Sequence, residues 1–209
     1  MLSPPAAQVA GVKPPISAAS ICAGARGIGA FSQTFPRWGR HDVWLIAEAV
    51  RAEVNKARCA AGLSRLAPDQ TLIRAAEVHT SDMIARAFFD HLSPVPGRRT
   101  PSDRIAAAGG QSRLTAENLA QAWYLNYESG RSFYTHDADA CRFTYTDGTT
   151  IQRHTYATLA KDLVAASMGS PGHRENILRS DVSLHGLAVG PTGDAALCGG
   201  LYATQLFAG

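Results

Sequence analysis

The sequence predicts an α+β fold: a three-layer α-β-α sandwich in which helices cover both faces of a central antiparallel sheet. Apolar residues recur at helical spacing in several segments between Asp42 and Leu178. The two apolar runs that follow, over residues 184–189 and 197–207, are typical of antiparallel strands. If these strands are apolar on both sides, both sheet faces need a cover of helices, which this sandwich provides.

The composition separates an N-terminal arm from one domain. Residues 1–40 are rich in Pro, Gly, Ala and Ser and lack helical or strand periodicity, which predicts an extended arm. Residues 41–209 are expected to form one domain. A chain of 209 residues that is 45% hydrophobic and 18% charged can bury a continuous apolar core.

Two long helices are predicted at the start of this domain. Asp42 is a plausible N-cap of the first helix, and Gly62 marks its end. The second helix begins near Pro68-Asp69 and carries an apolar stripe that includes His79. Because a residue on such a stripe faces the core, we interpret His79 as a structural histidine.

Shorter elements follow. Residues 100–103 have the pattern of a helix cap, with proline at the first helical position and an acid three residues after threonine. Helical spacing returns over residues 156–168, and Ser170-Pro171 caps a last short helix. Between these helices, Asp147-Gly148 gives a hairpin-like signal.

The four cysteines, Cys22, Cys59, Cys141 and Cys198, contain no C-x-x-C pair, so neither a zinc knuckle nor a thioredoxin-type site is indicated. They permit two disulfides in three alternative pairings, or free buried thiols. One pairing, Cys141 with Cys198, could link the segment after the third helix to the last strand.

The charge pattern argues against a nucleic-acid partner. The net charge is only +3, and no Lys/Arg-rich run is present.

No stretch approaches the roughly 18 apolar residues of a transmembrane helix, and residues 1–30 contain no signal peptide. We therefore expect either an exported protein whose leader is absent from this chain or a cytosolic one.

Several catalytic motifs are missing. The sequence has no H-E-x-x-H and no G-x-S-x-G, and the glycine-rich segment 24–29 lacks the preceding strand of a phosphate-binding loop. Candidate functional side chains remain at His91, Glu117 and His173. We interpret all three as lying in turns or helix starts, where side chains are free to point into a cleft.

The segments that contain these three residues, together with others along the chain and in this order, resemble the signature blocks of the bacterial branch of the CAP superfamily (the SCP domain of cysteine-rich secretory, antigen 5 and pathogenesis-related proteins). The resemblance runs from Val43 to Phe207. It is carried by residues 54–58 with 62–63, 76–83, the His91 segment through Arg104, Glu117-Asn118, 170–178 and 204–207.

The resemblance implies an α-β-α sandwich with a cleft of two histidines and two acids that often holds a divalent cation. His91 and His173 match the histidines, and Glu117 matches the first acid. The second acid and its W-x-x-E segment are absent, since residues 167–170 read Ser-Met-Gly-Ser. We therefore expect a three-residue site. Glu175 could substitute for the missing acid, but it lies about 200° round a helix from His173, so the two could not face one point without distortion.

The resemblance also favours a secreted or periplasmic protein and leaves two functions open. The first is a binding module for a small apolar ligand, such as a lipid or sterol, or for a cell-envelope component. The second is a metal-dependent hydrolase of peptides or cell-wall material, with Zn²⁺ on His91 and His173 and with Glu117 as ligand or general base. The same histidines could also order the cleft without a metal.

Overall fold

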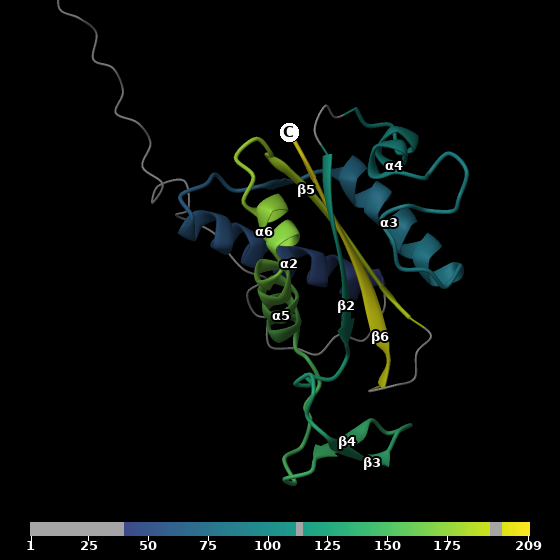
Figure 1. The fold of residues 1–209 in the computed structure, drawn as a ribbon, viewed down its shortest axis with the longest axis vertical. Helices are drawn as coiled ribbons and strands as arrows, with labels where there is room; N and C mark the ends of the chain where they lie inside the picture. The colour runs from purple at the N-terminus through teal and green to yellow at the C-terminus, as the bar shows by residue number, and fades with distance from the viewer. Residues whose placement is uncertain (1–39, 112–114, 193–197) are drawn as a thin grey trace, which may run out of the picture.

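The computed structural model describes residues 40–111, 115–192 and 198–209, with side chains from residue 43 onward (Figure 1). The helices are α2 (Arg40–Ala60), α3 (Gln70–Ala85), α4 (Pro101–Ala107), α5 (Tyr156–Gly169) and α6 (Pro171–Ile177), and the strands are β1 (Ala67–Pro68), β2 (Thr115–Trp123), β3 (Phe133–Asp137), β4 (Arg142–Tyr145), β5 (Leu184–Pro191) and β6 (Gly200–Ala208). Apart from Arg40, the predicted arm lies outside the described residues. No described helix has the length and apolar character needed to span a membrane.

The central sheet has the strand order β1-β5-β6-β2. Strand β6 pairs antiparallel with β5 on one side and with β2 on the other, as predicted for the two closing runs. The sheet is nevertheless mixed rather than purely antiparallel, because the two residues of β1 pair parallel with Leu184 and His185 of β5. Neither β1 nor β2 was predicted from the sequence.

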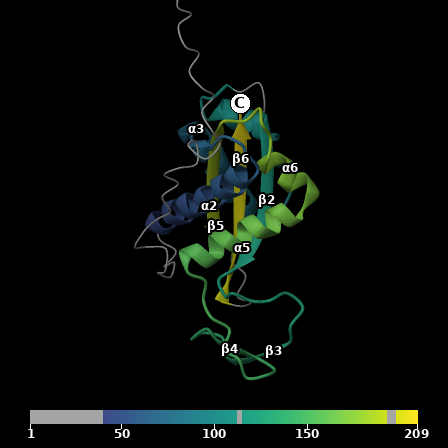
Figure 2. The ribbon, with the colours of Figure 1, turned by 90° about the vertical axis from the view of Figure 1, so that its left-hand side faces the viewer.

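The sheet lies between two helical layers (Figure 1), and Figure 2 shows α2 and α5 crossing one of its faces. Two apolar clusters join the sheet to these layers. On one face, α2 and α5 pack on residues such as Val189, Leu201 and Phe207. On the other face, α3 and α4 pack on Ala188 and Leu206. Because successive side chains along a strand point to opposite faces of the sheet, neighbouring residues of β5 and of β6 belong to different clusters. The predicted three-layer α-β-α sandwich is confirmed.

Helix α3 lies very close to β5. A Cβ atom on Gly186 would collide with the backbone of Leu72 and Ile73, so only glycine permits this approach. The helix starts where the sequence indicates, because the Asp69 carboxylate accepts hydrogen bonds from the backbone N–H groups of Thr71 and Leu72. The sheet and this helix therefore form one tightly packed unit.

A buried guanidinium joins the end of α2 to the segment after α6. Arg58 is 1% exposed, and no carboxylate within the described ranges pairs with it. Its nitrogens instead donate to four carbonyl oxygens, at 2.7 to 3.3 Å, which belong to Ser64, Ile177, Arg179 and Val182. Arg58 thus ties the segment around residues 58–64 to the distant segment 177–182.

Strands β3 and β4 form a separate hairpin that projects from the sandwich in Figure 1. It has its own small core of Leu125, Phe143, Tyr145 and Ile151. The hairpin-like signal at Asp147-Gly148 is confirmed, because Thr144 forms an antiparallel bridge with Thr150 and the Tyr145 N–H donates to the Thr149 carbonyl across this turn. Gly148 has a φ of +86°, and β3 and β4 themselves are joined by the residues between 137 and 142.

The described cysteines are oxidised. Cys141 and Cys198 form a disulfide with a Cα–Cα distance of 5.5 Å, which ties the projecting hairpin to the start of β6. Cys59 is also disulfide-bonded, and none of the described cysteines is free. The alternative of free buried thiols is therefore wrong for these residues, while Cys22 lies outside the described ranges.

A buried histidine should make the fold sensitive to acid. His185 is 2% exposed and lies beside the ring of Phe207, and burial lowers its pKa to about 4. An unfolded histidine titrates near pH 6.5, so between these values the unfolded chain binds a proton that the folded chain does not. Stability should be full above pH 6.5 and should fall by up to about 3 kcal/mol as the pH drops to 4.

Urea unfolding at pH 7.5, 5.5 and 4.5 would measure this loss in the native chain and in His185→Gln. We expect the variant to have a flatter pH dependence over this range. Exposed His136, replaced by Gln, serves as the control and should keep the native slope. If the slope were the same with and without His185, the acid sensitivity would have another origin.

Candidate functional site

The candidate site lies at the open edge of β2. Glu117 and Asn118 are consecutive on this strand, so their side chains point to opposite faces of the sheet. Glu117 points toward the layer of α3 and α4, whereas Asn118 points toward α6. The prediction that Glu117 lies in a turn or helix start was therefore wrong. The residue occupies a strand that is buried on both faces from 116 to 119.

The carboxylate of Glu117 is buried and both of its oxygens are engaged. Its side chain is 2% exposed. Oε2 accepts a hydrogen bond from Nη2 of Arg104 at 2.5 Å, and Oε1 accepts one from Nδ1 of His91 at 2.8 Å. Nε2 of His79 is 3.9 Å from the same Oε1. Glu117 is therefore the centre of a buried polar cluster, in which Arg104 balances its charge.

Arg104 also organises the loop that carries His91. It extends from α4, which begins with the predicted cap: Thr100 and Asp103 form a capping box. Its side chain is fully buried, and Nη1 donates to three loop carbonyls, those of His91, Arg98 and Arg99, at 3.1 to 3.3 Å. Sequence reasoning missed this role, because the partners are backbone atoms that no residue pattern marks.

His91 is half exposed and oriented by Glu117. Since a carboxylate can only accept, Nδ1 of His91 carries the donated proton, and in the neutral ring Nε2 keeps its lone pair. The hydrogen bond to Glu117 raises the pKa of His91, although partial burial opposes this. The ring is thus fixed with one nitrogen toward the interior and one left for a ligand.

His173 comes to the same edge from the other helical layer. Asn118 donates to its backbone carbonyl at 3.1 Å, and Asn176 donates both to the Asn118 side chain and to the Glu117 carbonyl. These bonds attach α6 to the outer edge of β2. Partial burial, and then the nearby charge of His91, lower the pKa of His173. The two imidazoles are therefore electrostatic neighbours across the strand edge.

His79 is a structural histidine, as predicted. It is fully buried, and its Nε2–H donates to the carbonyl of Asp90 at 3.0 Å, next to His91 in the chain. Burial is the main cause that lowers its pKa. Sequence reasoning placed His79 in the core but did not place it against the Glu117 cluster.

Of the three predicted metal ligands, His91 and His173 keep ring nitrogens that could bind an ion, whereas both oxygens of Glu117 are already hydrogen-bonded. Within the described ranges, no group of three or more His, Cys, Asp or Glu side chains is arranged to hold a metal ion. Glu175 is exposed and lines a separate hollow of about 350 Å³ beside α6. His91 nevertheless suits a metal, because metal-binding histidines usually donate their other nitrogen to a carboxylate, as His91 does to Glu117.

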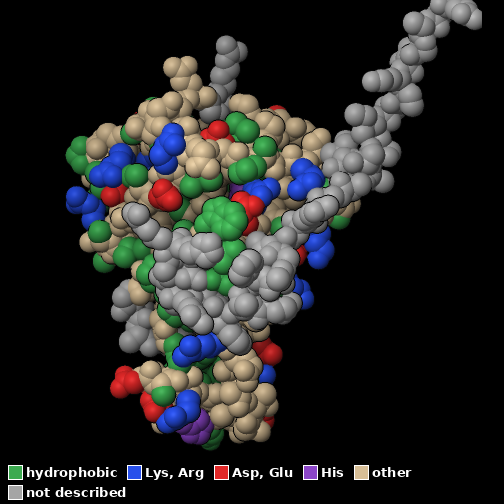
Figure 3. Space-filling model, turned by 180° about the vertical axis from the view of Figure 1, so that it is seen from behind, with side chains coloured by type: hydrophobic (Ala, Val, Ile, Leu, Met, Phe, Trp, Pro, Cys, Tyr) green, Lys and Arg blue, Asp and Glu red, His purple; other side chains and the backbone are tan. Residues whose placement is uncertain are grey.

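Charge on the visible surface is mixed. On the face in Figure 3, basic and acidic side chains are interspersed rather than gathered by sign. This pattern agrees with the small net charge, and the described side chains visible on that face form no extended basic track for a phosphate backbone.

The class of this domain is defined by an α-β-α sandwich in which a buried glutamate on an edge strand holds one histidine, and a second histidine reaches the same edge on a short helix. Residues 51–207 match the model of the cysteine-rich secretory protein family, CAP, and this chain belongs to that family. The predicted resemblance is thereby confirmed. None of the curated proteins matches the sequence.

Two solved structures share the fold. An extracellular protein containing an SCP domain from Bacillus anthracis has a TM-score of 0.52 at 21% identity; the match covers 81% of this chain but only 43% of that one. An outer surface protein from Borrelia burgdorferi has a TM-score of 0.50 at 18% identity, over 76% of this chain and 89% of that one. At these identities the similarity shows the fold alone.

Proposed function

We propose that this protein is a secreted or periplasmic binding domain whose polar anchor is the His91–His173 pair. The location is supported by the oxidised cysteines, which persist in oxidising compartments. It is also supported by the extracellular and outer-surface origin of the two similar structures. The ligand would be a small apolar molecule, such as a lipid or sterol, or a cell-envelope component.

A divalent cation, with Zn²⁺ the best fit, would bind Nε2 of His91 and a ring nitrogen of His173. Neutral imidazole is a preferred zinc ligand. When bound, the ion would supply a Lewis acid with open positions for an oxygen atom of the ligand. Glu117 would contribute by fixing the ring of His91, and Arg104 by holding Glu117 in place through their buried ion pair.

One observation favours binding over hydrolysis: Glu117 is buried and bonded to both Arg104 and His91. A hydrolase would need this carboxylate as a metal ligand or general base, which requires an oxygen free to accept a proton from water. Freeing Oε2 would leave the fully buried guanidinium of Arg104 without its ionic partner, at a cost of several kcal/mol. The binding function does not require a free carboxylate oxygen on Glu117.

Calorimetry with Zn²⁺, together with elemental analysis of the purified protein, tests this proposal. We expect one ion per chain in the native protein and no saturable binding in the His91→Ala/His173→Ala double variant. Glu117→Gln should bind Zn²⁺ about 10- to 100-fold more weakly, as is usual when a residue that hydrogen-bonds to a metal-binding histidine is replaced. His136→Ala is the matched control and should bind like the native chain.

A second measurement separates the two functions. Fatty acids and sterols should raise the melting temperature of a binding domain, because a ligand of the folded state stabilises it by mass action. Absence of Zn²⁺ binding in the native chain would refute the cation site. Turnover of a peptide or cell-wall substrate that His91→Ala abolishes would instead establish the hydrolase.

A further inference from the structure

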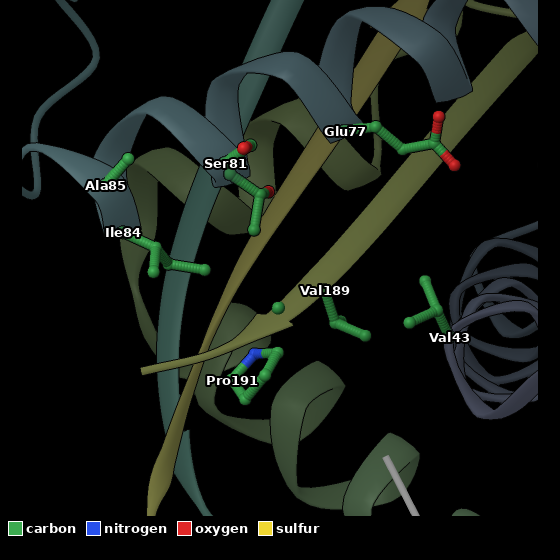
Figure 4. A pocket seen from close by; sticks show the side chains of 9 residues that line it. Val43, Glu77, Ser81, Ile84, Ala85, Val189 and Pro191 are labelled. Carbon is green, nitrogen blue, oxygen red and sulfur yellow. The ribbon is translucent and has the colours of Figure 1, made fainter. Parts of the chain in front are cut away.

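A cavity of about 660 Å³ lies at the open edge of β5, on the opposite side of the sheet from the β2 edge (Figure 4). Its apolar walls come from three elements, and Figure 4 shows Val43 of α2 and Val189 of β5 pointing toward one another across it. The full lining is Val43, Glu77, Thr80, Ser81, Ile84, Ala85, Val189, Gly190 and Pro191. Its volume is that of a pocket for a small ligand or a short peptide.

The backbone of β5 presents hydrogen-bonding groups along this edge. Along a paired strand, successive residues direct their N–H and C=O groups alternately to the two sides. The pairing with β1 shows which residues of β5 direct their backbone groups away from β6. The N–H groups of Ala67 and Asp69 donate to the carbonyls of Ser183 and His185. The outward groups therefore belong to the odd-numbered residues, and Val189 directs both its N–H and its C=O away from β6.

The outward N–H and C=O groups of β5 extend beyond the two residues that pair with β1. Strand β1 pairs only with Leu184 and His185, after which the chain turns into α3. Beyond that point, the described chain supplies no strand partner for Val189. The edge thus already accepts one parallel strand, and no second described strand pairs with it where it borders the cavity.

A negative charge lies on the wall of the cavity. Glu77 is exposed on α3 and has no ion-pair partner among the described residues. A ligand that fills the cavity and carries a positive charge on the side of α3 would therefore find a complementary carboxylate.

From these observations we infer that the β5 edge binds an extended peptide carrying a basic residue. The peptide would continue the line of β1 between α2 and α3, exchange backbone hydrogen bonds with Val189, and direct its basic side chain to Glu77. Such strand addition satisfies both polar groups of Val189, whereas a lipid chain in the same cavity would leave them unpaired. This inference is independent of the histidine pair and does not require the proposed cation.

The probe is a set of N-acetylated, C-amidated pentapeptides of valine and threonine with a single lysine placed at each position in turn, titrated into the full chain. We expect saturable binding for one lysine position, with slowed hydrogen exchange at the Val189 amide. N-methylation of the peptide amide that pairs with the Val189 carbonyl should weaken binding about tenfold, because the side chains stay but the donor is lost.

Variants at the cavity check its location. Glu77→Gln should weaken the lysine peptide several-fold but leave its norleucine analogue unchanged. Ala85→Trp, on the exposed side of α3, should block the cavity, whereas Ala106→Trp on α4 is the matched control and should bind normally. Lack of peptide binding, or equal binding of the N-methylated peptide, would overturn the inference. Binding of dodecanoate instead, lost in Ala85→Trp, would assign the cavity to a lipid.

Discussion

Arg104→Met should destabilise the protein by about 3–5 kcal/mol, because it removes the ionic partner of a carboxylate that stays buried. Glu117 would keep its hydrogen bond from His91 but lose the guanidinium that balances its charge. The three carbonyls of the His91 loop would lose their donor at the same time. Urea unfolding at pH 7.5 measures the change, and the exposed Arg99→Met is the control.

A double-mutant cycle then separates charge from packing. Glu117→Leu combined with Arg104→Met removes both buried charges, so the pair should cost clearly less than the sum of the two single changes. Additive effects would show that the two side chains do not stabilise each other. A loss below about 1 kcal/mol in Arg104→Met would show that the Glu117 cluster does not depend on the ion pair.

The second large effect is expected for Arg58→Met, at about 3–5 kcal/mol. This change leaves four buried or partly buried carbonyls without a donor, each worth about 1 kcal/mol or more. Arg58→Lys should recover only part of the loss, since a single ammonium cannot reach four acceptors in the geometry of a planar guanidinium. Thermal and urea unfolding would measure both variants.

Lys56→Met is the matched control for Arg58, because it lies on the same helix and its side chain is 76% exposed. Its pair with Glu53 is a surface ion pair, so its loss should be within about 0.5 kcal/mol. If Arg58→Met behaved like Lys56→Met, the backbone segments around Val182 would be held by packing alone, and the importance given to Arg58 would be wrong.

The helices could be predicted because their signals are local. Asp69 and Thr100 cap the helices that they precede, and these caps depend only on residues two or three positions away. Strand β2 could not be predicted in this way. Residues 116–119 are buried on both faces, so the alternation that marks a half-exposed strand is missing. Two of these four are polar residues whose partners lie on other elements.

The site was predictable as a set of residues but not as a geometry. His91, Glu117 and His173 stand in recognisable segments, and the structure brings all three to the edge of β2. Nothing local to Glu117 shows that Arg104 neutralises it, because the contact is made across the packed sandwich. The sequence therefore indicates which side chains form the candidate site, but it does not show that both carboxylate oxygens of Glu117 are already bonded to Arg104 and His91.

The disulfide between Cys141 and Cys198 determines what a protease could release from this molecule. The turn at Asp147-Gly148 is exposed in the projecting hairpin, which is the kind of place where proteases cut. Cys141 precedes this turn and Cys198 follows it, so the two pieces from a single cut would remain one covalent molecule. Since β2 lies in one piece and β6 in the other, the paired strands would also hold a nicked chain together, and releasing the fragments would require both a reductant and unfolding of the sheet.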